Sequence, residues 1–132
     1  MSRWVEELDD ELFDELQEAE PLFFVDFYAD WCGPCKAVAP VVERAAKAYT
    51  GRVTFGKLNI DEFPDIAARY GVRSIPTMVL FREGKQTTRI QGYASDAQLR
   101  VHLDRYAPQP EAEAEAPEVP GRGLLSRLLG RR

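Results

Sequence analysis

Cysteine and histidine are scarce in this chain of 132 residues, which contains two cysteines and one histidine. Two cysteines exclude the disulfide-rich scaffold that stabilises many small secreted domains. They also leave too few ligands for a structural zinc site, which usually needs four Cys or His side chains, because only His102 could join them. We therefore expect no bound metal.

Long apolar runs are missing as well. The chain starts with Met1-Ser2-Arg3-Trp4 and turns acidic at once, without an apolar segment that could act as a signal peptide or cross a membrane. We expect a protein of the reducing cytoplasm.

Positive charge is not concentrated in the main part of the chain. Residues 1–20 carry a formal charge of −8 and residues 21–106 carry +3, while four acids in 107–120 balance four arginines in 121–132. A nucleic-acid-binding domain usually presents a basic face, so we expect no nucleic-acid partner.

The two cysteines form one motif, Trp31-Cys32-Gly33-Pro34-Cys35, between an apolar run and a helical pattern. Residues three apart at a helix start lie on one face, so the two thiols can reach disulfide distance. Exposed N–H groups there favour the thiolate of Cys32, whereas Cys35, one turn inside, should be less exposed and less acidic. A bridge across so short a loop removes little chain entropy, which disfavours a purely structural disulfide. The motif predicts a reversible dithiol.

Hydrophobic periodicity predicts alternating strands and helices. The nearly continuous apolar run 22–29 is typical of a central strand covered on both faces. The other expected elements are an edge strand over 4–8, a helix over 10–18 capped by Asp9, a helix over 33–49, a strand over 53–60, a helix over 64–70, hairpin strands over 77–81 and 86–91 joined by 82–85, and a helix capped by Ser95 or Asp96 that extends to Tyr106. This order predicts an α/β fold in which helices flank both faces of a mixed β-sheet.

The composition changes at Ala107. Residues 107–120 are rich in Glu, Ala and Pro, which is typical of a solvated linker, and residues 121–132 form a basic tail of Leu, Arg and Gly. As a helix, the tail would gather four leucines on one side and could dock on a membrane surface or a partner protein. Its shortness and its glycines favour a disordered tail in the free protein. We expect a domain over residues 1–106 followed by these two segments.

Asp26 is the one charged residue in the apolar run 22–29. A carboxyl among aromatic and aliphatic side chains is poorly solvated, which raises its pKa and lets it exchange a proton near neutral pH. A position at the sheet edge, facing solvent, would remove this effect. Because the run is apolar on both sides of Asp26, we favour a buried carboxyl that takes part in proton transfer.

Three segments closely resemble the thioredoxins: residues 24–36, which include the cysteine motif, residues 57–61, and Ser74-Ile75-Pro76-Thr77. The resemblance runs from about Trp4 to Tyr106 and implies the thioredoxin fold. It implies a protein-disulfide reductase in which Cys32 attacks a disulfide of a substrate protein and Cys35 then breaks the mixed disulfide. An NADPH-dependent flavoprotein, thioredoxin reductase, would recharge the dithiol. The chain would need no bound cofactor and would act as a monomer in cellular redox homeostasis.

The resemblance also implies roles for residues outside the cysteine pair. It places Lys57 near the Asp26 carboxylate, although an ordinary strand lysine is an equal alternative. It implies that Pro76 is a cis-proline that presents Ile75 to an extended substrate segment, with a trans turn proline as the alternative. A flat apolar contact surface for substrates, or else simple packing, would account for Trp31, Gly33, Pro34, Ile60, Ile75, Pro76 and Gly92.

Three positions depart from the commonest thioredoxin pattern. Tyr28 stands where many members have Trp, Ser74 where Gly is frequent, and Gln91 where an apolar residue often borders the contact surface. Ser74 and Gln91 make that surface more polar, which affects the choice of partners and leaves the chemistry intact.

Two other functions compete with the reductase. An oxidase or isomerase of an oxidising compartment is disfavoured by the missing signal peptide and by Gly33-Pro34 between the cysteines. A docking module without redox activity is disfavoured because both cysteines are present.

Overall fold

The computed structural model of the protein describes residues 2–109. In chain order, the elements in this range are β1 (Val5–Glu7), α1 (Asp10–Ala19), β2 (Leu22–Tyr28), α2 (Gly33–Ala48), β3 (Thr54–Asn59), α3 (Pro64–Arg69), β4 (Thr77–Arg82), β5 (Lys85–Gln91) and α4 (Asp96–Tyr106). The predicted order of strands and helices is confirmed. The expected basic tail, and most of the expected linker, lie outside the described residues.

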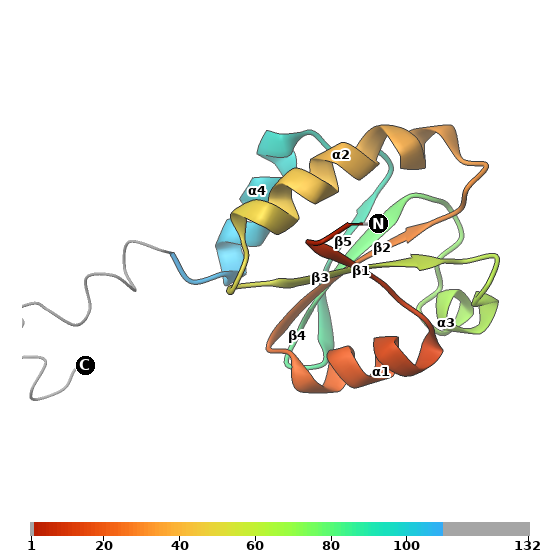
Figure 1. Cartoon of the computed structure of the whole chain (residues 1–132), viewed down its shortest axis with the longest axis horizontal. Coiled ribbons are helices and arrows are strands. Elements are labelled where there is room, and N and C mark those ends of the chain that lie inside the picture. The colour runs from red at the N-terminus through yellow and green to blue at the C-terminus, as the bar shows by residue number, and fades with distance from the viewer. Residues whose placement is uncertain (1, 110–132) are drawn as a thin grey trace, which may run out of the picture.

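The strands of this range form one mixed sheet in the order β1-β3-β2-β4-β5. Strand β3 is parallel to β1 and β2, whereas β4 is antiparallel to β2 and β5. Figure 1 shows α2 and α4 on one face of the sheet and α1 and α3 on the other. The predicted mixed sheet with helices on both faces is therefore confirmed, with β1 at an edge and β2 in the centre.

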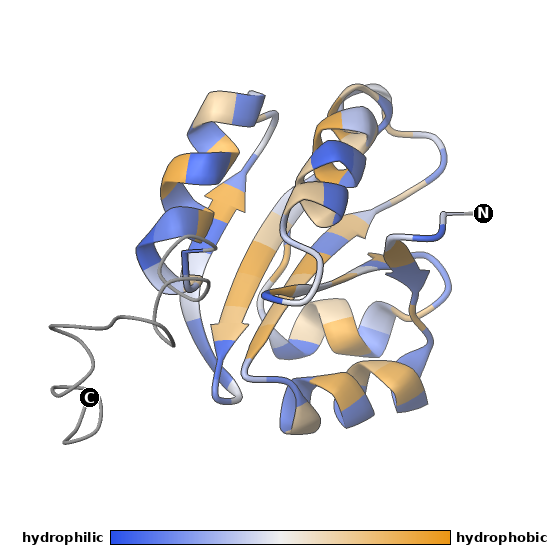
Figure 2. Cartoon of the chain, turned by 60° about the vertical axis from the view of Figure 1, so that its left-hand side comes forward, coloured by the Kyte–Doolittle hydropathy of each residue, from blue (hydrophilic) through white to orange (hydrophobic). Residues whose placement is uncertain are grey.

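Strand β2 supplies side chains to two apolar clusters. Phe24 packs in the cluster that includes α2 and α4, while Phe23, Val25 and Phe27 pack in the cluster that includes α1 and α3. Figure 2 shows that the central strands are largely hydrophobic, while the helices carry both hydrophobic and hydrophilic residues. Because successive residues of a strand point to opposite faces, Asp26 shares the α2 face with Phe24.

The helix starts confirm the predicted caps. Asp9 Oδ1 accepts a hydrogen bond from Leu12 N at 2.8 Å at the start of α1. Ser95, rather than Asp96, caps α4: Ser95 Oγ accepts from Gln98 N at 3.1 Å, and Ser95 N donates to Gln98 Oε1 at 2.9 Å. This reciprocal pair is a capping box.

The β4–β5 hairpin is tighter than the sequence predicts. Arg82 pairs with Lys85, so the turn contains only Glu83 and Gly84, whose φ angles are 52° and 81°. Positive φ at both central residues is the mark of a type I′ turn. The predicted connection over 82–85 was wrong, because the exposed and charged Arg82 and Lys85 belong to the ends of the two strands.

Within residues 2–109, no helix is long and apolar enough to cross a membrane. In the same range, His, Cys, Asp and Glu side chains form no cluster of three or more that could hold a metal ion.

Candidate active site

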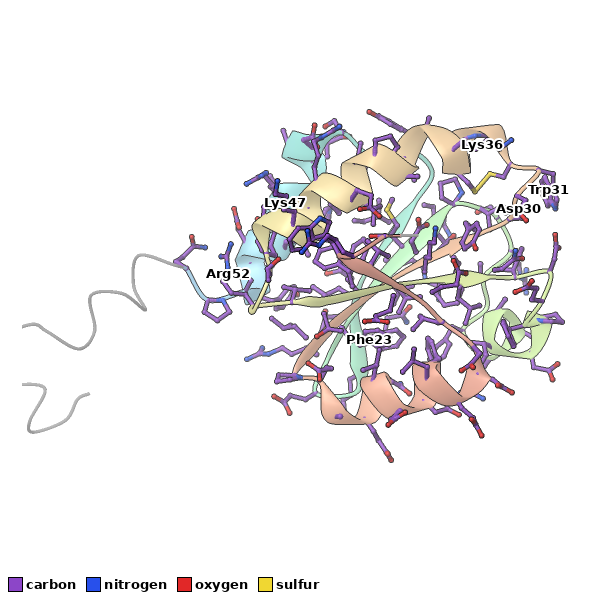
Figure 3. The ribbon with its side chains drawn as sticks, in the orientation of Figure 1. Phe23, Asp30, Trp31, Lys36, Lys47 and Arg52 are labelled. Carbon is purple, nitrogen blue, oxygen red and sulfur yellow. A yellow bond between two sulfur atoms is a disulfide. The ribbon has the colours of Figure 1, made fainter. Side chains whose placement is uncertain are left out.

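The two cysteines lie between the end of β2 and the first turn of α2. They form a disulfide, with their Cα atoms 5.2 Å apart. Cys32 is the N-cap of α2, and its Sγ accepts a hydrogen bond from Cys35 N at 3.1 Å. Figure 3 shows the disulfide near Trp31 and Lys36, at the end of α2 opposite Lys47. The predicted disulfide reach at a helix start is confirmed.

Both cysteines are buried in this oxidised state. Each exposes only 4% of its surface, so the expectation of a more exposed Cys32 is wrong for this state. The reason is that Cys32 Sγ lies 3.7 Å from Ile75 O, in addition to its contact with Cys35 N. A backbone oxygen from a segment far along the chain therefore lies against the first cysteine.

The segment around Pro76 lies opposite Cys32, as the resemblance implies. The Ile75–Pro76 peptide bond is cis, and Pro76 O accepts a hydrogen bond from Gly92 N at 2.8 Å. Gly92 has a φ of 86°, a conformation that favours glycine. The structure thus brings Ile75, Pro76 and Gly92 together beside the dithiol.

The other expected contact residues lie near the same end of the molecule. Trp31 is 68% exposed, and its Nε1 donates a hydrogen bond to Asp61 Oδ2 at 2.9 Å. Gly33 and Pro34 form the first turn of α2. Ile60 is half-buried and packs against the cluster under α1 and α3. Asp61 was not singled out from the sequence, although it ends the segment 57–61 that carries part of the resemblance.

Asp26 is a buried carboxyl, as predicted. It is 4% exposed, and its Oδ1 has no hydrogen-bond partner in the described part of the chain. Burial raises the pKa of Asp26 from 3.8 to about 7; the positive charge of Lys57 opposes this rise and the negative charge of Glu7 adds to it. A carboxyl in this range can take up or release a proton near neutral pH.

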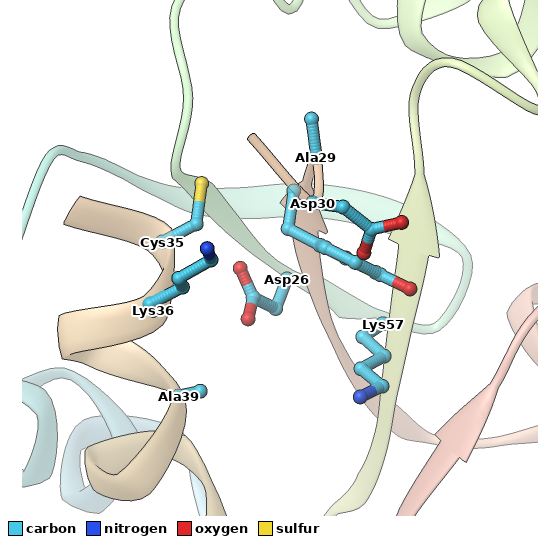
Figure 4. A pocket seen from close by; sticks show the side chains of 8 residues that line it. Asp26, Ala29, Asp30, Cys35, Lys36, Ala39 and Lys57 are labelled. Atoms are coloured by element: carbon cyan, nitrogen blue, oxygen red, sulfur yellow. The ribbon is translucent and has the colours of Figure 1, made fainter. Parts of the chain in front are cut away.

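A cavity of about 180 Å³ lies between Asp26 and Cys35. It is lined by Asp26, Tyr28, Ala29, Asp30, Cys35, Lys36, Ala39 and Lys57. Figure 4 shows the Asp26 carboxyl between α2, which carries Cys35 and Lys36, and Lys57 on β3. The space is large enough for water, which can relay a proton between a carboxyl and a thiol that do not touch.

Lys57 lies beside Asp26 because the two residues are neighbours in the β2–β3 register. Its Nζ lies 3.6 Å from Glu7 Oε1 and 5.4 Å from the centre of the Tyr28 ring. Among residues 2–109, the ion pair of Lys57 is with Glu7 and not with Asp26. Sequence reasoning missed Glu7, because only the register of β1 against β3 brings it to the site.

Comparison with known proteins decides the family. The family model described as Thioredoxin matches residues 4–105. The chain belongs to the thioredoxin family. It is 45% identical over 96 residues to the thioredoxin of Allochromatium vinosum, a match that covers 73% of this chain and 90% of the relative. The thioredoxin of Alicyclobacillus acidocaldarius is 41% identical over 96 residues, with coverage of 73% and 91%.

Structural comparison agrees with this assignment. The solution structure of oxidised thioredoxin from Plasmodium falciparum matches with a TM-score of 0.71 and 32% identity, covering 79% of this chain and 99% of that one. The chloroplastic M-type thioredoxin of Spinacia oleracea is 44% identical over 89 residues, which are 67% of this chain. The chain spans about half the length of that relative, 49%. In this member of the family, Cys32 and Cys35 form a disulfide.

Proposed function

We propose that this thioredoxin-family protein is a protein-disulfide reductase that works through the Cys32–Cys35 dithiol. The observation that carries the proposal is a disulfide at the start of α2 that shares a cavity with a buried carboxyl, Asp26. A reversible cysteine pair with a proton acceptor beside its second member is what a two-step thiol-disulfide exchange requires.

In the first step, the Cys32 thiolate attacks one sulfur of the substrate disulfide. A bond forms between Cys32 Sγ and that sulfur, while the substrate disulfide breaks and its other sulfur leaves as a thiolate that takes up a proton. The start of α2 stabilises the attacking thiolate, because Cys35 N–H donates to Cys32 Sγ and helix N-termini favour negative charge.

In the second step, Cys35 resolves the mixed disulfide. The Cys35 thiol gives its proton to the Asp26 carboxylate through the cavity, and the resulting thiolate attacks Cys32 Sγ. The bond between Cys32 and the substrate breaks, the substrate sulfur leaves as a second thiolate, and two electrons have passed to the substrate. The Cys32–Cys35 disulfide of this structure is the product. A pKa of about 7 suits Asp26 to this transfer.

The proposed contact surface for substrates surrounds the dithiol. We infer that an extended substrate segment lies along the Ile75–Pro76 backbone, because Ile75 O faces Cys32 Sγ. Trp31, the most exposed large apolar side chain at this end, would cover the segment. The proposed surface comprises Trp31, Gly33, Pro34, Ile60, Ile75, Pro76 and Gly92, and the exposed Ser74 and Gln91 on its border would select partners by hydrogen bonding.

A reductase must itself be recharged. We propose an NADPH-dependent flavoprotein, thioredoxin reductase, as electron donor, and a monomer as the working form.

The cytoplasm is the compartment we favour, because a dithiol that donates electrons needs reducing surroundings. The relatives named as chloroplastic make a plastid the alternative.

The function is tested by turnover and trapping. With dithiothreitol as the recharging reductant, the protein should reduce an exposed protein disulfide catalytically, and Cys32→Ser should abolish this activity.

Cys35→Ser should accumulate a mixed disulfide through Cys32, which mass spectrometry identifies. Trapping through Cys35 in the Cys32→Ser variant would contradict the assigned roles. A double serine variant that retains its cellular function would favour a docking module instead.

A further inference from the structure

Three strands contribute to a charged cluster beside the Asp26 cavity. Figure 4 shows one member of this cluster, Lys57, on the side of Asp26 away from Cys35. Glu7 Oε2 on β1 accepts a hydrogen bond from the Tyr28 hydroxyl on β2 at 2.7 Å. Glu7 Oε1 lies 3.6 Å from Lys57 Nζ on β3, and the same ammonium lies 5.4 Å from the centre of the Tyr28 ring. Glu7 is therefore fixed by Tyr28 and in turn engages Lys57.

Strand register explains why these groups meet. Glu7 pairs with Lys57 in β1–β3, and Lys57 pairs with Asp26 in β2–β3. The three side chains thus stand in one row on the same face of the sheet, with Lys57 between two carboxyls. In the described residues, the ammonium forms its ion pair with Glu7, while Asp26 Oδ1 has no hydrogen-bond partner.

We propose that Glu7 is a positioning residue that holds the Lys57 ammonium at the rim of the cavity, away from the Asp26 carboxyl. Two carboxyls compete for one cation. The Glu7 side chain is 47% exposed, so ionising it costs little desolvation, whereas an ionised Asp26 must be stabilised inside an apolar site. Lys57 therefore pairs with Glu7, and Asp26 keeps its proton to a higher pH than it would beside a free ammonium.

The other residues around Asp26 do not take over the effect of Glu7 on its carboxyl. Besides Glu7 and Lys57, the groups that line the cavity or pair with Asp26 are Tyr28, Ala29 and Asp30 at the end of β2 and after it, Met78 of β4, and Cys35, Lys36 and Ala39 of α2. Asp30 and Lys36 carry opposite charges, and the charges that act most on the pKa of Asp26 are those of Lys57 and Glu7. The pKa of Asp26 therefore depends mainly on its burial and on the opposing charges of Glu7 and Lys57.

This inference rests on the proposed role of Asp26 as the proton acceptor for Cys35. Within that role, Glu7 sets the strength of the base. A carboxylate with a free ammonium beside it ionises at lower pH and is therefore a weaker acceptor for the thiol proton. A proton acceptor works best when its pKa lies near the working pH.

The direct test is an NMR titration of the Asp26 carboxyl in the oxidised full-length protein, comparing Glu7→Gln with the parent. The substitution preserves the size of the side chain and its acceptor for the Tyr28 hydroxyl, and it removes the charge that engages Lys57. We expect the titration midpoint of Asp26 to fall by several tenths of a pH unit or more. An unchanged midpoint overturns the proposal.

Glu6→Gln is the matched control. Glu6 precedes Glu7 on β1, is exposed, and points to the opposite face of the sheet. Glu6 carries the same charge as Glu7, yet removal of that charge by Glu6→Gln should leave the titration midpoint of Asp26 nearly unchanged. A shift as large as that of Glu7→Gln would show that net charge alone acts on Asp26.

A double substitution separates positioning from a direct charge effect. If Glu7 acts by holding Lys57, the shift caused by Glu7→Gln should shrink in a Lys57→Met background, because residues that share one interaction are not additive. An equal shift in both backgrounds overturns the positioning role.

The functional readout is the rate at which Cys35 resolves a preformed mixed disulfide on Cys32, measured across pH. In Glu7→Gln, the acid limb of this profile should move to lower pH together with the Asp26 midpoint. A midpoint that moves while the rate profile stays fixed would refute the role of Asp26 in resolution, and the effect of Glu7 on Asp26 would still stand.

Discussion

The carboxyl of Asp26 lies on a buried strand, and its Oδ1 has no hydrogen-bond partner among residues 2–109. Burial raises its pKa from 3.8 to about 7, so between these values the folded chain holds the proton more tightly than the unfolded chain. The free energy of unfolding therefore falls as the pH rises from about 4 towards 7, and the loss is complete above that range. The property that suits Asp26 to proton transfer thus lowers stability at neutral pH.

Asp26→Asn should remove this penalty. We expect the variant to be more stable than the parent by about 2 to 4 kcal/mol at pH ~8 and by nearly nothing at pH ~4, where the parent carboxyl is already neutral. Denaturant unfolding of the oxidised protein at both pH values measures the difference. Asp30→Asn, at an exposed position near the same cavity, is the control and should show no such pH dependence. An Asp26→Asn effect that is the same at both pH values would contradict the argument.

Residues whose behaviour depends on near neighbours could be predicted from the sequence. Asp26 is buried because the residues on either side of it are apolar, and that pattern is visible in the chain. The exposure of Cys32 and the contact of Glu7 with Lys57 could not be predicted, because they depend on Ile75 and on the β1–β3 register. Long-range pairing of backbone segments leaves no signal in a local pattern.

The same distinction holds for whole elements. Helix caps use side chains within three residues of the helix start, so Asp9 could be identified in advance and the cap of α4 could be narrowed to Ser95 or Asp96. The length of the β4–β5 turn could not, because exposed charged residues occur both in loops and at the ends of edge strands. Arg82 and Lys85 are such strand ends.

The type I′ turn leads to a prediction about hairpin stability. Glu83 has a φ of 52°, which costs an ordinary L-residue on the order of 1 kcal/mol, whereas Asn tolerates this region and Asn-Gly is favoured in such turns. Glu83→Asn should therefore raise the free energy of unfolding by about 0.5 to 1 kcal/mol, and its backbone N–H keeps its hydrogen bond to Pro21 O. Urea unfolding measures the change.

Gly84→Ala is the opposing variant for this turn. Gly84 has a φ of 81°, so a side chain there should destabilise the protein by roughly 1 kcal/mol or more. If Glu83→Asn fails to stabilise while Gly84→Ala destabilises, the Glu83 side chain makes a contact that offsets its backbone strain.

At the scale of the whole molecule, the lateral order of the strands does not follow from their order in the chain. Alternating elements predict a mixed sheet, and the resemblance to thioredoxins implies how the strands are arranged. The observed order places β3 between β1 and β2. This order joins the acidic N-terminal segment to the redox site, since it sets Glu7, Lys57 and Asp26 in one row.

Contacts just beyond α4 join residues after Tyr106 to the folded unit. Ala107 N donates to Leu103 O at 2.9 Å, and Ala107 is buried in the cluster between the sheet and helices α2 and α4. Pro108 O accepts a hydrogen bond from Arg52 Nη1 at 2.9 Å. We therefore propose that the folded unit extends past the expected boundary at Tyr106 to include Ala107 and Pro108.

Two truncations test this boundary and the independence of the tail. A chain that ends at Gln109 should match the full-length protein in free energy of unfolding and in disulfide turnover. A chain that ends at Tyr106 should lose about 1 to 2 kcal/mol, because it lacks the buried Ala107 and the Arg52 contact and places a new carboxylate at the negative end of α4. Its turnover should persist, because the dithiol lies at the opposite end of the molecule (Figure 3).

The same pair of proteins tests what residues 110–132 add. Four leucines and four arginines in 121–132 suit an anionic membrane surface, so the full-length protein, and not the chain that ends at Gln109, should co-sediment with vesicles that contain anionic lipid. Neutral vesicles are the control, because they remove the attraction to arginine and leave the apolar contribution. Equal sedimentation of both proteins would leave the tail without a membrane role, and loss of turnover in the chain that ends at Gln109 would show that the tail takes part in the reductase itself.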